Sequence, residues 1–451
     1  MKITVTKKNL SIAVRELRRA ADARSSIEAL GRVLAEVRDG RLVLRATNGD
    51  MAAVAAVPGE ADAGDGENLV AFPLDILERA TKAKCGEITV SAEPGEDGIS
   101  TVEIRAGRSK LRTDGPMARP FSSEVEEVLA HDESDDDPAE IAEWRSALLH
   151  YLRWFGAAPG QPKDESKVLD SVTFYNPKSL LVSVTEAMSS EETRYYLNGV
   201  YFDATKPGQG LTVVAADGHR LVTWPCGIVD NFGEGDGHGY IASGDVLHAL
   251  KAGAGARSDA LSLAFRKISF VPNPHAAKAE HRVVEASYSL GGIDFRLTGK
   301  VIDASYPEWR RVIPEEKDAK TVVSVPFDGF METVREVLAL SGSRGRHART
   351  AAALNLSLKD KTFTISIENG GAEVEGSFPR PSDAARGGSA DKSIEIGFNI
   401  QYLAKIPDML GEVGDLEGRN LVLRFVDSGS PGVFHVDGDD VRLILMPMRI
   451  K

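Results

Sequence analysis

Four neighbouring residues in the stretch VVAADGHRLVTW (213–224) carry groups that could do chemistry. Asp217 and His219 offer a carboxylate and an imidazole, the pairing that a hydrolase uses for general acid–base catalysis. Gly218 and Arg220 complete the set. An Asp-Gly pair between two runs rich in Val and Leu is also typical of a tight turn that carries a binding surface. The enzymatic interpretation is the weaker one, because the sequence has no recognisable nucleophile elbow, metal triad or nucleotide loop.

The composition is that of a globular protein with several domains. A chain of 451 residues is too long for one ordinary core, so two to four domains are expected. No apolar run approaches the ~20 residues of a membrane span, and the first residues, MKITVTKKNL, do not resemble a signal peptide. Cys85 and Cys226 lie far apart, which indicates a reducing, cytoplasmic setting without disulfides or zinc. No membrane partner, metal or cofactor is therefore expected.

Helical and strand-like segments alternate with a regular period. Six amphipathic stretches have apolar residues at helical spacing, and between them lie strand-like runs such as RLVLRAT, EITVSAE, GLTVVAA, TFTISIE and LVLRFVD. The six predicted helices begin near residues 10, 74, 177, 245, 328 and 400. One helix with several strands recurs about every 70 residues, which predicts three similar α+β domains of two helices and two sheets each.

The one long interval between predicted helices contains an insertion at 124–167. It opens acidic, closes with a Gly/Pro/Lys linker, and has a helical middle in which Asp137 caps and Pro138 takes the first position. The apolar stripe of this helix is Ile141, Trp144, Leu148, Leu152 and Phe155. The stripe could pack on its own domain, or it could form a partner surface or a guard over one.

Cations collect on the predicted helices while much of the acid lies in loops. The net charge of −13 argues against nucleic-acid binding, but a basic strip can lie on an acidic body. Helix phase places Arg15, Arg18 and Arg19 opposite the apolar face of the first helix, and Arg24 follows it. Cations recur near the second, fourth and fifth helices, a pattern that suits sequence-independent contact with phosphates.

Five short motifs occur in a fixed order: RYYLNG (194–199), DGHRL (217–221), YPEWRRVIP (306–314), IGFN (396–399) and MPMR (446–449). Each is weak alone. Together they resemble the bacterial DNA polymerase III beta sliding clamp, and the resemblance covers nearly the whole chain except the insertion. It implies the DNA clamp fold, with clamp domains at 1–123, 168–319 and 320–451 and two helices on antiparallel sheets in each. Two such chains would close head to tail as a homodimeric ring.

The resemblance implies that the DGHRL segment is not catalytic but helps to form a peptide groove between the second and third domains. The matching groove residues are Leu197, Gly218, His219, Arg220, Leu221, Pro307, Arg311, Val312, Asn399, Tyr402, Leu445, Met446, Pro447, Met448 and Arg449. Methionines suit such a groove because they adapt to different apolar peptides.

For DNA, the resemblance points to Arg24, Tyr195 and Tyr196, and helix phase adds Arg15, Arg18 and Arg19. For the dimer seam it points to Leu111 and Leu340, with Thr113 and Ala339 smaller than usual. Gly429 stands where the groove usually has a branched apolar residue, so the groove's rim is expected to differ.

The implied function is a non-catalytic processivity factor. A ring would hold duplex DNA by topology and tether the DNA polymerase III alpha subunit and other proteins with clamp-binding motifs. Because the sequence has no G-x-x-x-x-G-K-[ST] loop, an ATP-dependent clamp loader would be a separate protein. The alternatives are a hydrolase built on Asp217 and His219, and a clamp-like protein that binds partners without encircling DNA, such as a decoy or drug-tolerant second copy.

Overall fold

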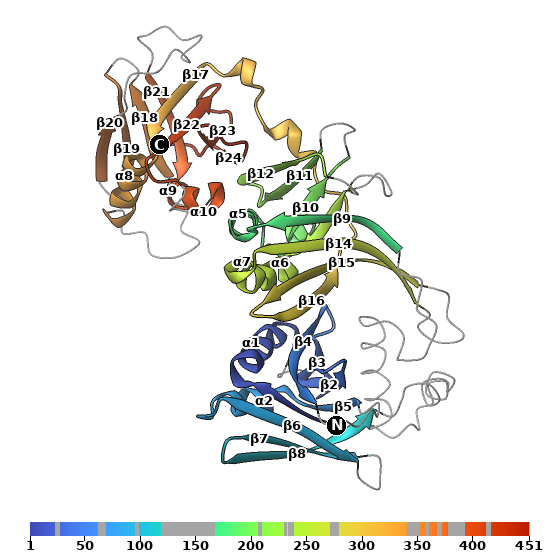
Figure 1. Ribbon diagram of the computed structural model, residues 1–451. Coiled ribbons are helices and arrows are strands. Elements are labelled where there is room, and N and C mark those ends of the chain that lie inside the picture. The colour runs from blue at the N-terminus through green and yellow to red at the C-terminus, as the bar shows by residue number, and fades with distance from the viewer. Residues whose placement is uncertain are drawn as a thin grey trace. The chain divides into compact units, whose positions relative to one another are not determined.

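Antiparallel sheets with short helices packed on them make up the chain (Figure 1). The computed structural model of the protein describes residues 1–22, 28–61, 69–94, 99–118, 167–205, 210–229, 232, 239–270, 279–340, 351–357, 360–367, 372–377, 393–411 and 416–450. Every strand pairing within these residues is antiparallel, so the predicted mixture of helices and antiparallel sheets is confirmed.

Two compact units divide the chain. The first comprises Met1–Pro177, Asp230–Asp236 and His248–Val301, and the second comprises Lys178–Val229, Gly237–Leu247 and Ile302–Lys451. The three domain boundaries expected from the sequence do not coincide with this division. They stay a prediction, because the sequence repeat counts elements whereas the units count contacts.

A sheet of twelve strands, in the order β1-β6-β7-β8-β5-β2-β3-β4-β16-β15-β14-β9, forms the first unit. Its strands are β1 (Lys2–Thr6), β2 (Arg32–Arg38), β3 (Arg41–Thr47), β4 (Met51–Ala61), β5 (Leu69–Pro73), β6 (Glu87–Pro94), β7 (Ile99–Ala106), β8 (Ser109–Ala118), β9 (Lys167–Tyr175), β14 (Ala260–Phe270), β15 (Ala279–Leu290) and β16 (Ile293–Lys300). The pairing of β4 with β16 makes one sheet from segments far apart in sequence.

The helices of the first unit are α1 (Lys7–Leu17), α2 (Leu74–Thr81) and α7 (Ala254–Arg257), with short 3-10 turns at Arg18–Ala20 and Glu28–Gly31. Helix α1 begins at Thr6, whose hydroxyl accepts a hydrogen bond from the Asn9 amide. Leu10, Val14 and Leu17 are buried, as their spacing predicts. Helix α6 (Gly244–Ala252) starts directly after β13.

Two sheets form the second unit, with eight strands in the order β13-β10-β11-β12-β24-β23-β22-β17 and four in the order β20-β19-β18-β21. The strands are β10 (Gly199–Asp203), β11 (Leu211–Ala216), β12 (Arg220–Gly227), β13 (Tyr240–Ser243), β17 (Thr321–Pro326), β18 (Ala351–Ser357), β19 (Thr362–Ile367), β20 (Ala372–Ser377), β21 (Ser393–Asn399), β22 (Asn420–Phe425), β23 (Gly432–Val436) and β24 (Arg442–Leu445).

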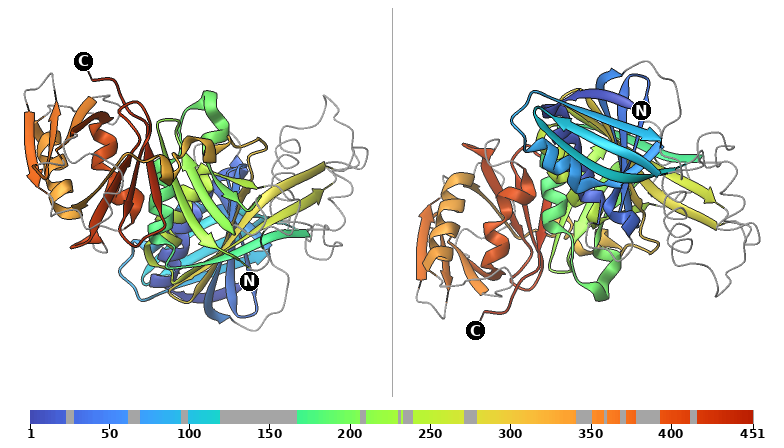
Figure 2. Two further views of the ribbon diagram at one scale, coloured as in Figure 1. Left: turned by 90° about the horizontal axis from the view of Figure 1, so that it is seen from above. Right: turned by 90° about the horizontal axis from the view of Figure 1, so that it is seen from below.

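Four helices of the second unit cover these sheets: α5 (Lys178–Ala187), α8 (Phe327–Leu340), α9 (Ile400–Ala404) and α10 (Ile406–Leu410). Helices α8 and α9 pack on the four-stranded sheet, whereas α5 and α10 pack on each other and on the eight-stranded sheet (Figure 2). Phe398, Phe425 and Phe434 meet with ring centroids 5.5–6.1 Å apart and fill the core beside them.

All six predicted helices are present, the sixth as the pair α9 and α10 with Pro407 in the first turn of α10. The prediction of a strand before Asn198 is wrong, because Glu192–Leu197 is a 3-10 helix. Asn198 closes this helix by donating its side-chain amide to the Glu191 carbonyl oxygen, and β10 follows. The predicted helix within 124–167 lies outside the described residues.

Candidate functional site

The Asp217-Gly218 pair is a turn between β11 and β12. One oxygen of the Asp217 carboxylate accepts hydrogen bonds from the amides of His219 (2.8 Å) and Arg220 (2.9 Å), and the other accepts from Arg220 Nε (2.9 Å). Gly218 has φ +87°, a conformation that side chains rarely adopt. A Cβ there would also lie 2.4 Å from Arg194 Nη1. The carboxylate is therefore used to build the turn, which favours the binding interpretation over a catalytic base.

Arg220 connects this turn to the helices on one face of the eight-stranded sheet. Its guanidinium lies 3.5 Å from the Glu186 carboxylate and stacks over the Tyr402 ring at 4.7 Å. Nη1 also lies 3.8 Å from the Met409 sulfur. Arg220 is mostly buried by these contacts, so it holds the shape of the site and leaves few donors for a ligand.

The opposite face of this sheet carries an apolar cluster. Its buried members are Leu197, Val214, Ala216, Leu221, Trp309, Val433 and Ile444. Leu221 pairs directly with Ile444 across β12 and β24, and Ile444 pairs with Val433 on β23. Side chains of paired residues share a face, so three strands contribute to one apolar surface. The predicted groove residues Leu197 and Leu221 belong to it.

The segment Ser305–Pro314 crosses this face and is fixed by one buried carboxylate. Asp203, 1% exposed, accepts hydrogen bonds from Trp309 Nε1 (2.7 Å) and Arg310 Nη1 (2.6 Å). Burial alone would raise the pKa of Asp203, but hydrogen bonds from Thr205 and Trp309 and the Arg310 charge outweigh it and hold the pKa low. This anchor leaves Pro307, Arg311 and Val312 exposed at the edge of the cluster.

The segment after β24 is held by two backbone hydrogen bonds. The Met446 amide donates to the His219 carbonyl (2.8 Å), and the Met448 amide donates to Gly397 (2.8 Å). Met446 is 38% exposed, and Arg449 is also exposed. The MPMR segment thus lies along DGHRL on one side and IGFN on the other, which brings three of the five motifs together.

Two of the predicted groove residues have other surroundings. Asn399 is buried and caps α9, because its side-chain oxygen accepts from the Gln401 amide. Leu445 pairs with Arg220, so it lies on the helix-covered face of the sheet and not with the apolar cluster. Ile444 is the β24 residue that faces the cluster, and the sequence analysis missed it. Strict alternation counted back from Met446 along RLILM would have pointed to it.

A hollow of about 730 Å³ adjoins the exposed residues of the crossing segment. It is lined by Arg311, Val312, Pro314, Lys317, Asp318, Ala319, Lys320, Val426, Ser430 and Pro431. Its size is within the range of sites that bind ligands, and it lies beside Gly429, where the expected branched side chain is missing. Asp427 shapes this rim by accepting from the amides of Gly429 (2.9 Å) and Ser430 (2.8 Å).

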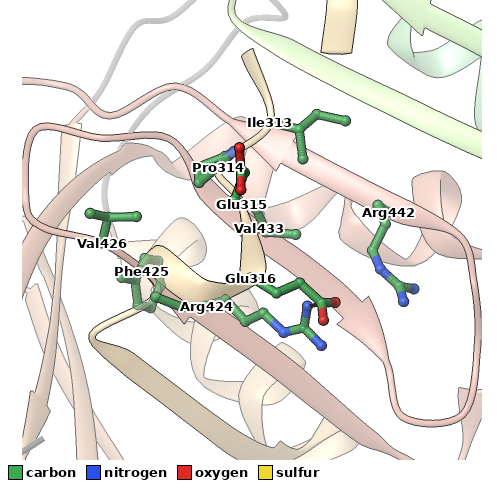
Figure 3. A pocket seen from close by; sticks show the side chains of 10 residues that line it. Ile313, Pro314, Glu315, Glu316, Arg424, Phe425, Val426, Val433 and Arg442 are labelled. Carbon is green, nitrogen blue, oxygen red and sulfur yellow. Dashed lines mark hydrogen bonds and ion pairs between the residues drawn. The ribbon is translucent and has the colours of Figure 1, made fainter. Parts of the chain in front are cut away.

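A smaller cavity of about 70 Å³ lies between the segment after Ile313 and the strands β22–β24 (Figure 3). Ile313 and Val433 line it and also contact the apolar cluster, so the two are continuous. Arg424 and Arg442 give this cavity a basic wall.

His435 on β23 is buried near these arginines, at 6% exposure. Burial first, and then the charges of Arg442 and Arg424, lower the pKa of His435 to about 4, against weaker opposing effects of Asp437 and Glu316. The imidazole is therefore neutral at physiological pH.

The low pKa of His435 predicts a loss of stability in acid. Below about pH 6.5 the unfolded chain binds a proton that the folded chain refuses until about pH 4, so folding weakens as the pH falls through this window. Relative to His435→Gln, the protein should lose on the order of 2 kcal/mol of unfolding free energy between pH 7 and 4.5. Urea unfolding of both proteins at the two pH values measures this, and equal losses would contradict it.

The helix cations predicted to meet DNA are partly engaged with acids. Arg15 and Arg19 both lie on the buried carboxylate of Glu16, at 3.2 and 3.0 Å, and Arg19 also donates to the Ala252 carbonyl. Arg18 pairs with Glu78 of α2 and is still 67% exposed. Helix phase placed these arginines at the surface but did not identify their partners. Arg24 lies outside the described residues.

In the second unit, Tyr195 is 55% exposed and meets Tyr196 edge to face, with ring centroids 5.9 Å apart. Tyr196 is partly buried against the apolar cluster. For the predicted seam, Leu340 at the end of α8 is 63% exposed, and Leu111 on β8 is half-buried. DNA contact and dimerisation by these residues stay predictions.

Enzymatic features are sparse in the described part of the chain. No group of three or more His, Cys, Asp or Glu side chains could hold a metal ion there. Burial raises the pKa of Cys226 to about 12, which makes its thiol a poor nucleophile. Among the same residues, no helix is long and apolar enough to cross a membrane.

Comparison with known proteins identifies what the fold and the motifs resemble. A beta sliding clamp of Caulobacter vibrioides is 25% identical over 463 residues, covering all of both chains. A DnaN sliding clamp (DNA polymerase III subunit beta) from Bartonella birtlesii bound to griselimycin has a TM-score of 0.67 at 22% identity. A Helicobacter pylori beta clamp bound to a DNA ligase peptide has a TM-score of 0.66 at 16% identity. Both structures cover the chain completely, whereas no family model matches.

The chain therefore has the fold of the DNA sliding clamps. It is a divergent relative of the bacterial beta sliding clamp, the beta subunit of DNA polymerase III.

Proposed function

We propose that this protein is a non-catalytic sliding clamp that encircles duplex DNA and tethers a polymerase and other replication proteins through a peptide groove. The observation that carries the proposal is the apolar surface of Leu221, Ile444 and Val433, bordered by the exposed Val312 and Met446. An apolar floor with adaptable, exposed edges suits short peptides with leucine or phenylalanine anchors. The Helicobacter pylori relative, bound to a DNA ligase peptide, supports this use of the fold.

The edges of the sheets support a homodimeric ring. Within the described residues, Ser109–Gly115 of β8 pair with β7 alone, and β20 pairs with β19 alone. Arg105, Lys110 and Arg112 surround one acid, Glu103, near the first edge, whereas Glu375 is exposed on the second. A basic edge and an acidic edge in one chain can join head to tail, and this closes a ring when two copies meet.

Weak contact with DNA is consistent with sliding. The arginines of α1 are partly neutralised by Glu16 and Glu78, so each adds little to phosphate binding. A ring holds DNA by topology and needs no strong contact, while a tethered polymerase rebinds the primer end at high effective concentration. The same neutralised arginines would also fit a clamp-like protein that binds partners without encircling DNA.

Topological retention separates these two functions. The protein is loaded on nicked circular DNA by a clamp loader, isolated, and the circle is then cut. We expect the bound protein to be lost on cutting, because a ring slides off free ends. The matched control is Leu340→Asp, an exposed change at the predicted seam, which should reduce loading without unfolding the chain. Equal retention on circles and linear DNA would mean surface binding and would overturn the ring.

A further inference from the structure

The small cavity between the segment after Ile313 and the strands β22–β24 has the charge of an anion site. It is lined by Ile313, Pro314, Glu315, Glu316, Ala319, Arg424, Phe425, Val426, Val433 and Arg442. Its volume of about 70 Å³ suits one small polar group and is well below the ~300–1,000 Å³ of sites that enclose whole ligands. Because Val433 and Ile313 also belong to the groove's apolar surface, a group in this cavity would be attached to a chain lying in the groove.

Two guanidinium groups face this cavity and lack sufficient acid. The side chains of Arg424 and Arg442 are each only 23% exposed, which makes their charges poorly screened. Burial, and then the charge of Arg424, lower the pKa of Arg442. The nearest carboxylate to Arg442 is Asp440 at 3.8 Å, and it is 90% exposed, so it compensates weakly.

Glu316 supplies a carboxylate from the surface. It forms an ion pair with Arg424, and Figure 3 shows both guanidinium groups turned toward it. Yet 74% of the Glu316 side chain is exposed, and it comes from the three-residue 3-10 helix Glu316–Asp318. A carboxylate that is held by one ion pair and otherwise solvated can swing away at small cost.

We propose that this cavity is a specificity subsite that accepts an aspartate or glutamate side chain of the partner peptide next to its apolar anchor, and that Glu316 occupies the site until the peptide displaces it. The proposal deepens the groove function proposed above and rests on it. The carboxylate would bind Arg424 and Arg442 together, because guanidinium groups form strong paired hydrogen bonds with carboxylates.

The preference for acid would have to be local. The chain carries a net charge of −13, so its overall field repels an acidic peptide. An acidic peptide that nevertheless binds better than its neutral twin must meet a basic site, and Arg424 and Arg442 are placed to provide it.

Fluorescence anisotropy with paired peptides tests the proposal. Each labelled peptide carries two leucines, with a single Asp at one of the flanking positions, and each has an Asn twin. We expect at least one Asp peptide to bind about three- to tenfold more tightly than its twin. Arg442→Gln should remove the difference. Glu316→Gln should strengthen binding of the Asp peptide about two- to threefold and leave the Asn peptide unchanged, because the competing carboxylate is gone.

Glu315→Gln is the matched control, since it removes the same charge from the neighbouring residue, whose carboxylate pairs with Lys317 and not with the arginines. Equal gains from Glu315→Gln and Glu316→Gln would overturn the place-holder role. Equal binding of Asp and Asn peptides at all positions would overturn the subsite while leaving the groove intact. If no peptide binds the unaltered protein, the groove itself is wrong, and the subsite with it. Because Glu316 is exposed, its variant remains folded and informative even if Arg442→Gln does not fold.

Discussion

Replacing Asp203 with alanine is expected to destabilise the second unit by about 3–5 kcal/mol, the usual result of removing one partner from a buried, hydrogen-bonded charge pair. The carboxylate accepts from the Trp309 indole, the Arg310 guanidinium and Thr205, and it is 1% exposed. Alanine would leave the indole N–H and a largely buried guanidinium without their acceptor. Urea unfolding followed by tryptophan fluorescence measures the loss.

Two controls qualify the Asp203 result. Asp303→Ala removes an exposed carboxylate from the same stretch of chain and should change stability by less than about 0.5 kcal/mol. The effect should also depend on pH with a defined sign. Because folding lowers the pKa of Asp203, its contribution is present above the unfolded pKa near 3.8 and disappears as the pH falls through the folded value. A loss below about 1 kcal/mol at pH 7 would show that the crossing segment is held by other contacts.

Truncating both exposed edges of the groove should almost abolish peptide binding. In the double variant Val312→Ala and Met446→Ala, the two partly exposed apolar side chains that border the cluster are lost. Central apolar contacts typically cost more than 1 kcal/mol each when truncated, so we expect a fall in affinity of about 30- to 100-fold for a leucine-containing peptide. Isothermal titration with the unaltered and double-variant proteins measures it.

The control for the groove is Ile228→Ala. Ile228 is 84% exposed just beyond β12, so it matches the truncation in chemistry but lies outside the cluster. Its affinity should be unchanged. A double variant that binds as tightly as the unaltered protein would show that peptides do not use this surface, whatever the family resemblance.

Local patterns predicted much of the fold. The apolar periodicity of α1, α5 and α8 located these helices, because burying a stripe depends only on spacing along one element. The Asp217-Gly218 turn was also predictable, since its hydrogen bonds stay within four residues.

Long-range partners were not predictable in the same way. The sequence exposed Arg19 but did not reveal that Glu16 and the Ala252 carbonyl hold it. It placed Leu445 in the groove, although the pairing of Arg220 with Leu445 puts Ile444 on that face. A shift of one residue along a strand exchanges the two faces, and only the pairing fixes it. Arg424, Arg442 and Glu316 come from three separate segments, so their meeting carried no signal in any one motif.

The position of β24 between β12 and β23 has a consequence for synthesis of the chain. On the ribosome, β10–β13 emerge long before Arg442–Leu445, yet β12 has no other partner on that side within the described residues. Until β24 arrives, the nascent chain carries an open, apolar strand edge, which is a template for aggregation. Translation speed between these two segments, and chaperones that shield the edge, should therefore govern how much protein reaches its native state.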